Sequence, residues 1–135
     1  MSKKVNVAQI GIGYWGPNLL RNLISNKNCS VNYVVDKSEN RREYVKSLYN
    51  QLEVIDDFNV VMNDKSIDAV IIATPAQTHF KLAMESLEND KNILVEKPMA
   101  TTKKEVAKIK KLSNAKKLIA MVGHTFIYNP AVRFI

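Results

Sequence analysis

The stretch VNVAQIGIGYWGPNLL, residues 5–20, holds three of the four glycines of this 135-residue chain. Its dense apolar beginning predicts a buried strand, which a glycine turn connects to a helix. Gly11, Gly13 and Gly16 have the G-x-G-x-x-G spacing of dinucleotide-binding loops. The first glycine makes the tight turn, the second lets the backbone approach a pyrophosphate, and the third lets the helix pack on the strand. The free N–H groups at the start of that helix favour a bound pyrophosphate.

A second buried strand is expected over residues 31–35, and Asp36 follows it directly, twenty residues after Gly16. An acidic residue at this distance from the glycine loop accepts hydrogen bonds from the adenosine ribose of a dinucleotide. Because a carboxylate repels a ribose 2′-phosphate, Asp36 favours NAD over NADP, although Lys37 and Arg41 are close enough in sequence to oppose that preference. The alternative is that Asp36 only opens the next turn or caps a helix.

Apolar runs and helical periodicities alternate along the rest of the chain. Further strands or short apolar steps are expected at residues 54–55, 67–75, 92–95 and 117–122, and helices at 39–48, from 56–57, at 78–87, after 102 and from 129–130. Ser38 is the expected cap of the 39–48 helix, and Thr102 and Glu105 have the spacing of a capping box. This alternation predicts an α/β fold, a doubly wound parallel sheet of the Rossmann type, in one domain over residues 1–122.

Polar residues and glycines follow five of the predicted strands at their carboxyl ends. In a parallel sheet these ends share one edge, and ligands bind beyond that edge near the reversal of strand order. The residues expected there are Gly11, Gly13, Asp36, Thr74, Pro75, Glu96, Lys97, Gly123 and His124.

Three motifs together resemble a known family: the glycine loop, Ala73-Thr74-Pro75 with His79 four residues on, and Glu96-Lys97-Pro98. The chain resembles, over essentially its whole length, the N-terminal cofactor-binding half of the glucose–fructose oxidoreductase, inositol dehydrogenase and MocA (Gfo/Idh/MocA) family. Residues 75–79 and 123–130 are most similar to members that act on sugar nucleotides, such as UDP-N-acetylglucosamine 3-dehydrogenases.

The resemblance implies a role for each matching residue. Lys97 is the catalytic lysine, and a cis peptide before Pro98 fits the family. Glu96 and Lys97 also belong to the cofactor site, Tyr14 and Trp15 to the pyrophosphate turn, and Thr74 and Pro75 flank the nicotinamide ribose. His79 lies near the cofactor by the resemblance, or is an ordinary cap or surface histidine. His124 and Asn129 are the weaker candidates for contact with substrate.

The chemistry of hydride transfer agrees with the role implied for Lys97. Moving a hydride between a sugar carbon and nicotinamide C4 places charge on the sugar oxygen. A cationic donor beside that oxygen stabilises the developing alkoxide and assists the proton transfer. The alternative is a lysine that reaches solvent from a strand end.

Composition limits the other classes of function. The net charge of +7 includes seven lysines between residues 103 and 117, where apolar residues recur at helical spacing. A solvated helix face is favoured over nucleic-acid binding, because that window lacks arginine and aromatic residues. Cys29 is the only cysteine, the two histidines have no acidic residues at ligand spacing, and no metal site is expected. Without a long apolar run or signal sequence, a cytoplasmic protein without membrane contact is expected.

Members of the family are much longer, so the resemblance implies that their C-terminal α+β domain is absent here. Residues 123–135 are then a crossover segment toward it. That domain carries the substrate pocket and the subunit interface, so we expect cofactor binding without turnover by this chain alone. One hypothesis is the cofactor half of an NAD-dependent sugar or sugar-nucleotide dehydrogenase, an oxidoreductase; the other is a stand-alone dinucleotide-binding or sensor module. The apolar tail predicts self-association.

Overall fold

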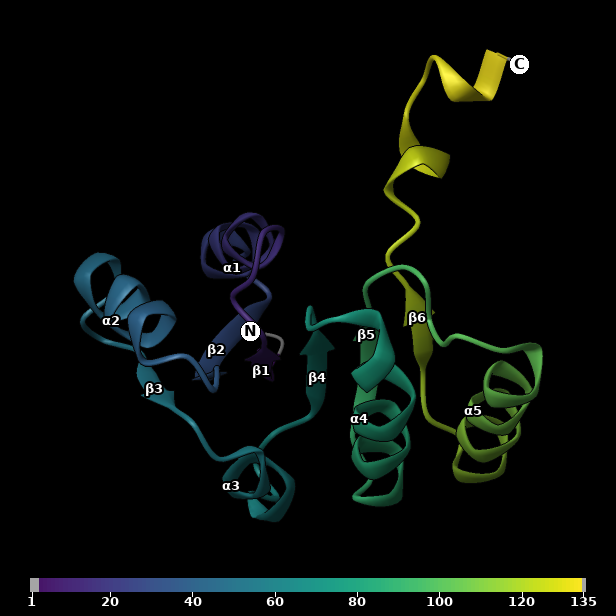
Figure 1. Ribbon diagram of the computed structural model, residues 1–135, viewed down its shortest axis with the longest axis horizontal. Coiled ribbons are helices and arrows are strands. Elements are labelled where there is room, and N and C mark those ends of the chain that lie inside the picture. Colours follow the sequence, from purple (N-terminus) through teal and green to yellow (C-terminus); the bar gives the residue numbers. More distant parts are fainter. Residues whose placement is uncertain (1–2, 135) are drawn as a thin grey trace.

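The computed structural model describes residues 3–134 and forms one six-stranded parallel sheet with helices on both faces (Figure 1). The strand order is β3-β2-β1-β4-β5-β6. The strands are β1 Val5–Ile10, β2 Cys29–Val35, β3 Glu53–Ile55, β4 Ala69–Ile72, β5 Asn92–Val95 and β6 Ala120–Val122. The helices are α1 Gly16–Ser25, α2 Glu39–Leu48, α3 Phe58–Asn63, α4 Ala76–Glu88, α5 Lys103–Lys116, and two 3₁₀ turns, η1 Thr125–Tyr128 and η2 Val132–Phe134.

Strand β1 lies between β2 and β4, so the strand order reverses at its carboxyl end. Ile10 pairs with Val35 on one side and with Ile72 on the other, and these three strands therefore end level. Strands β5 and β6 continue the same edge through the Ile72–Val95 and Val95–Val122 pairs. This is the doubly wound Rossmann arrangement that the sequence predicts, and the prediction of the fold is confirmed.

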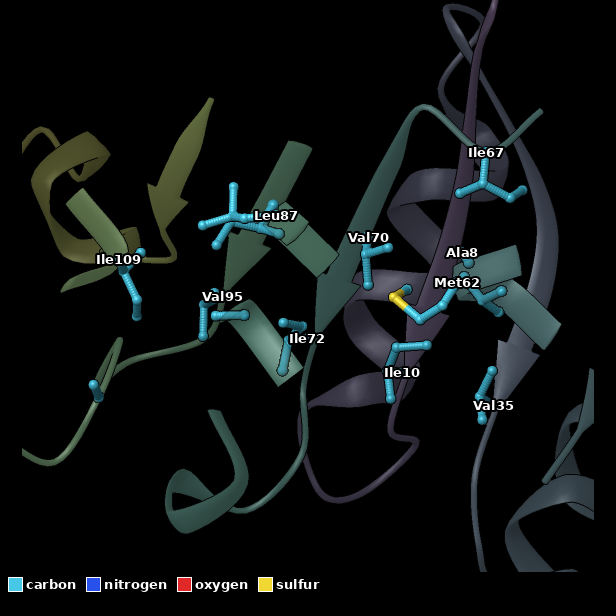
Figure 2. Packing of buried hydrophobic residues seen from close by; sticks show 14 residues of the cluster. Ala8, Ile10, Val35, Met62, Ile67, Val70, Ile72, Leu87, Val95 and Ile109 are labelled. Atoms are coloured by element: carbon cyan, nitrogen blue, oxygen red, sulfur yellow. The ribbon is translucent and has the colours of Figure 1, made fainter. Parts of the chain in front are cut away.

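Apolar side chains cover both faces of the sheet, because successive residues of a strand point to opposite sides. Val35 belongs with Ile10 to the larger cluster, which α3, α4 and α5 cover (Figure 2). Its neighbour Val34 belongs with Leu20 of α1 and Val45 of α2 to the smaller cluster. Burying one such side chain contributes about 1.5–3 kcal/mol. Helix packing on both faces therefore fixes the positions of the strand ends.

Several elements differ from their expected bounds: β2 begins at Cys29 instead of residue 31, and β4 spans Ala69–Ile72 instead of 67–75. For two others, a single backbone position gives the reason. Strand β6 begins at Ala120, since Lys117 has φ 56° and ends α5 in the left-handed conformation. Helix α4 begins at Ala76, two residues before its expected start. Pro75 occupies the N-cap there, and its carbonyl accepts the N–H of Thr78 at 2.9 Å. Local apolar patterns predicted both elements, but not where their backbone changes direction.

The chain leaves the sheet after β6, and this tail contains only η1 and η2 (yellow in Figure 1). Asn129 lies between them. Its Oδ1 accepts the N–H of Ala131 at 2.9 Å and its carbonyl accepts the N–H of Val132 at 3.1 Å, so the helix start expected at Asn129 is present as the 3₁₀ turn η2. Phe126 and Ile127 are 65% and 56% exposed. These exposed apolar side chains are consistent with self-association, which stays a prediction. The expected domain boundary between residues 122 and 123 also stays a prediction.

None of the helices within residues 3–134 is long and apolar enough to cross a membrane. In that same range, no three His, Cys, Asp or Glu side chains gather in a way that would hold a metal ion.

The predicted capping box at the head of α5 is present. The Thr102 hydroxyl accepts the Glu105 N–H at 3.2 Å, and the Glu105 carboxylate accepts the Thr102 N–H at 3.1 Å. Hydrogen bonds from Thr101 and then Thr102 hold the pKa of Glu105 below its ordinary value. The contribution of this carboxylate to stability is therefore present above the ordinary glutamate pKa and is lost as the pH falls through the lowered value.

Replacing Thr102 with alanine should lower the free energy of unfolding by about 1 kcal/mol, because one N–H of the first turn loses its acceptor. Urea unfolding followed by circular dichroism measures this change. Lys111→Ala, on the exposed middle of the same helix, is the matched control and should stay within about 0.5 kcal/mol of wild type. Equal stability of the Thr102 variant and wild type would contradict the assigned cap.

Candidate cofactor-binding site

The glycine turn after β1 is held by close backbone contacts. Gly11 has φ +95°, and a Cβ at this position would lie 2.5 Å from the carbonyl oxygen of Ala73. A Cβ on Gly16 would lie 2.7 Å from the carbonyl oxygen of Gly11. By contrast, nothing lies within 4 Å of the Cβ position of Gly13. The first and third glycines therefore allow the fold, whereas the second leaves an open face on the turn.

A buried glutamine supports this turn from below. Gln9 is fully buried in β1, and its Nε2 donates to the carbonyls of Gly11 at 3.1 Å and Gly16 at 2.8 Å. Its Oε1 has no partner among the described residues. Sequence reasoning missed this residue, although a polar side chain within an otherwise apolar strand was the available signal.

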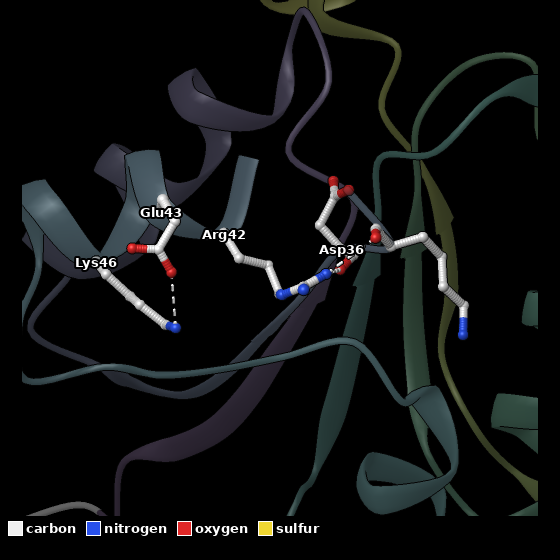
Figure 3. A network of polar contacts seen from close by, with 5 residues as sticks. Asp36, Arg42, Glu43 and Lys46 are labelled. Carbon is white, nitrogen blue, oxygen red and sulfur yellow. Dashed lines mark hydrogen bonds and ion pairs between the residues drawn. The ribbon is translucent and has the colours of Figure 1, made fainter. Parts of the chain in front are cut away.

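Asp36, at the end of β2, joins the glycine turn to the next loop. Its Oδ2 accepts the N–H of Ile12 at 2.7 Å, and its Oδ1 accepts the N–H of Ser38 at 2.8 Å. Arg42 of α2 fixes the same loop by donating to the carbonyls of Asp36 and Lys37, both at 2.9 Å (Figure 3). Asp36 thus opens a turn, as the alternative reading required, and the same turn carries its half-buried carboxylate to the strand edge.

Helix α2 follows this turn, and its first N–H groups receive no hydrogen bond from the side chain of the N-cap residue. Ser38 occupies the N-cap of α2 and makes no side-chain cap bond, contrary to the expected role of its hydroxyl. Within α2, Glu43 pairs with Lys46 at 3.0 Å, on the exposed side of the helix (Figure 3).

A cleft of about 1160 Å³ runs along the carboxyl ends of the strands. It brings together eleven of the residues that the sequence nominated: Gly11, Gly13, Tyr14, Trp15, Asp36, Lys37, Arg41, Thr74, Pro75, Glu96 and Lys97. These residues follow β1, β2, β4 and β5, so four strand ends contribute to one cavity.

Five nominated residues do not line this cleft, and one of them is Gly123, directly after β6. Gly16 packs behind the turn, and His79 is 1% exposed beneath the loops after β4 and β5. His79 is therefore not the surface histidine that the alternative considered. His124 and Asn129 are exposed on the tail, where Thr125 and Phe126 reach the cleft instead.

Further lining residues were missed by sequence reasoning. Gln77, Lys81 and Glu85 recur every four residues on α4 and thus share one helix face. Lys81 and Glu85 also form an ion pair at 3.9 Å. Asp57 and Phe58, at the start of α3, close the end of the cleft beyond β3. The spacing of these three residues shows that they share one face of α4. It does not show whether that face borders the cleft or solvent.

Glu96 and Lys97, in the loop after β5, line the cleft, and the Lys97–Pro98 peptide of this loop is cis, as the resemblance implies. Glu96 Oε2 accepts the N–H of Lys97 at 3.3 Å, while Oε1 is buried with no partner among the described residues. A Cβ on Gly123 would lie 2.8 Å from that Oε1, so the glycine after β6 leaves room for the carboxylate. The Lys97 side chain is exposed and forms no ion pair within residues 3–134.

These features define a class of protein. A glycine turn, an acidic residue at the end of β2 and a cleft at the reversal of a parallel sheet are the parts of a Rossmann dinucleotide-binding domain. The chain belongs to the Gfo/Idh/MocA oxidoreductase family, whose NAD-binding Rossmann-fold model matches residues 5–124.

Curated relatives agree with this assignment, and a solved structure has the same fold. The uncharacterized oxidoreductase YdgJ of Escherichia coli (strain K12) is 29% identical over 124 residues, which are 92% of this chain and 35% of that protein. The scyllo-inositol 2-dehydrogenase (NAD(+)) of Bacillus subtilis (strain 168) is 30% identical over 132 residues, 97% of this chain and 39% of that protein. GenD2 from gentamicin A biosynthesis, solved in complex with NAD, has a TM-score of 0.90 at 24% identity, covering 96% of this chain and 37% of GenD2. The chain thus spans well under half the length of these proteins.

Proposed function

We propose that this chain binds NAD as the cofactor domain of an oxidoreductase that transfers a hydride between nicotinamide and a sugar or sugar-nucleotide hydroxyl. The observation that carries the proposal is the cleft, which holds the glycine turn, Asp36 and Lys97 along one sheet edge. Donors at the turn suit a pyrophosphate, and the carboxylate suits ribose hydroxyls. The scyllo-inositol 2-dehydrogenase relative supports a polyhydroxylated substrate.

Lys97 is the residue that we assign to catalysis. When bound, the nicotinamide supplies the hydride chemistry, and the chain must stabilise charge on the substrate oxygen. In the direction that reduces a carbonyl, a lysine ammonium beside that oxygen stabilises the developing alkoxide and donates a proton to it; in the direction that oxidises the hydroxyl, the neutral amine accepts the hydroxyl proton. Lys97 fits because it lines the cleft and has no anionic partner within residues 3–134.

The preference of the site for NAD over NADP rests on opposing charges at one corner of the cleft. Asp36 disfavours a ribose 2′-phosphate, and Lys37 and Arg41 line the same cavity and favour it. We give the carboxylate more weight, because Asp36 is held against the glycine turn at 2.7 Å, whereas the two cations are exposed. Cofactor binding is thus proposed to be selective for NAD.

Wild-type protein should bind NADH, and NADPH about tenfold or more weakly, since the two differ only by the 2′-phosphate that Asp36 repels. Calorimetric titration with each nucleotide at one ionic strength measures both affinities. Arg41→Ala is the matched variant: it should weaken NADPH binding further and change NADH binding by no more than about twofold. If neither nucleotide binds, the proposed function is wrong; if both bind equally, only the assigned preference is wrong.

A dinucleotide-binding module without catalysis is the second candidate, because His124 and Asn129, the residues nominated for contact with substrate, do not line the cleft. Both candidates predict NADH binding. They differ when the chain is mixed with the separately expressed C-terminal part of a family member. Reduction of NAD⁺ by a sugar or sugar nucleotide in that mixture, and its loss in Lys97→Met, would support the dehydrogenase; binding without turnover would support the module.

A further inference from the structure

His79 links two neighbouring loops, after β4 and β5, whose residues Thr74 and Lys97 line the cleft. It lies in the first turn of α4 and is 1% exposed. Its Nδ1 lies 2.6 Å from the carbonyl oxygen of Pro98, and its Nε2 lies 2.7 Å from the carbonyl oxygen of Thr74. Thr74 follows β4 and Pro98 follows β5, so one ring contacts both loops.

Backbone hydrogen bonds do not join these two loops where His79 contacts them, within the described residues. The ladder between β4 and β5 ends where the N–H of Glu96 donates to the carbonyl of Ile72 at 2.9 Å. Past that bond, no backbone hydrogen bond joins residues 73–75 to residues 97–98 in the described part of the chain. The imidazole therefore provides the polar connection beyond the end of the sheet.

The ring suits this task chemically. The Thr74 and Pro98 carbonyl oxygens face the buried His79 ring, and a carbonyl shut off from water without a donor costs about 1–3 kcal/mol, so a hydrogen-bond donor at this position is favourable. Either neutral tautomer of imidazole gives an N–H to one of them, and the protonated ring gives an N–H to both. A purely apolar side chain of the same volume would leave both without a donor.

We propose that His79 is a positioning residue that sets the distance between the Thr74 loop and the Lys97 loop. This proposal rests on the proposed cofactor function. His79 does not touch the cleft itself; it acts through the carbonyl of Pro98, the residue next to Lys97, and through Thr74. The part of the cleft that depends on it is the end at β4 and β5, away from Asp36 at the end of β2.

NADH and ADP distinguish the two ends, because ADP carries the adenosine and diphosphate but no nicotinamide or second ribose. We expect His79→Phe to weaken NADH binding about tenfold while ADP binding stays within about twofold of wild type. His79→Asn, which retains an amide donor, should recover part of the lost NADH affinity. Calorimetry with both nucleotides on the full chain measures these effects.

Ser86→Ala is the matched control. Ser86 is a second fully buried polar side chain of α4, but its hydroxyl donates to Leu82 within the same helix and joins no loops. This variant should leave the ratio of NADH to ADP affinities unchanged even if it lowers the melting temperature. If His79 only stabilised the fold, its variants would likewise leave the ratio of NADH to ADP affinities unchanged.

A measurement on wild type keeps the proposal testable if His79→Phe fails to fold. In ¹⁵N-edited spectra, His79 should show a slowly exchanging ring N–H whose shift changes with NADH but not with ADP. Equal losses of NADH and ADP affinity in the folded variants, or no protected ring N–H in wild type, would overturn the positioning role. Failure of wild type to bind NADH would instead refute the proposed function.

Discussion

Gly11→Ala should abolish measurable NADH binding and lower the free energy of unfolding by about 2–5 kcal/mol. Alanine is strained at φ +95°, and its Cβ would lie 2.5 Å from the carbonyl oxygen of Ala73, 2.7 Å from the carbonyl carbon and 2.9 Å from Thr74 Cγ2. Two of these atoms are backbone at the end of β4, so they cannot rotate away. The glycine turn must therefore move, and the free N–H groups at the start of α1, which are proposed to bind the pyrophosphate, move with it.

Gly13→Ala is the matched control for stability. Its Cβ would meet nothing within 4 Å, and Gly13 is not at a positive φ. Thermal and urea unfolding should therefore separate the two glycine variants, with Gly13→Ala within about 0.5 kcal/mol of wild type. A Gly11→Ala protein that unfolds like wild type and still binds NADH would contradict the role assigned to the glycine turn.

Asp36→Ala should weaken NADH binding about ten- to hundredfold, because hydrogen bonds to a charged group contribute about 1.5–3 kcal/mol. The substitution removes the proposed acceptor for ribose hydroxyls. It also leaves the N–H groups of Ile12 and Ser38 without the carboxylate oxygens that hold them at 2.7 and 2.8 Å. Asp36→Asn retains one oxygen acceptor and should show an intermediate loss.

The ratio of NADPH to NADH affinity provides a second measure of Asp36. Removing the carboxylate also removes the repulsion of a 2′-phosphate, so NADPH should lose less affinity than NADH. Calorimetry with both nucleotides tests this, with Glu39→Gln as the control, because Glu39 is an exposed acid three residues on that does not line the cleft. Parallel losses of both nucleotides in Asp36→Ala would show that the residue only braces the turn.

Local sequence patterns predicted much of the fold. The β1 strand, the glycine turn and the start of α1 follow from one apolar run and three spaced glycines. Strand β5 and the capping box of α5 match their expected residues, because each depends on side chains within a few positions of one another. The nomination of Lys97 and Glu96 for the strand edge also followed from their place after an apolar run.

The sequence by itself thus determined the alternation of strands and helices and the residues that end most of the strands; β4, expected to run to Pro75, ends at Ile72. Only the tertiary structure decided which strand ends are neighbours. Contacts between Gly11 and Ala73, between Ile12 and Asp36, and between His79 and Pro98 join residues far apart in the chain. Periodicity is a local property, whereas these contacts exist because β1 lies between β2 and β4, and β5 lies beside β4. That strand order, which the helices secure by burying both faces of the sheet, turns separate loops into one cleft.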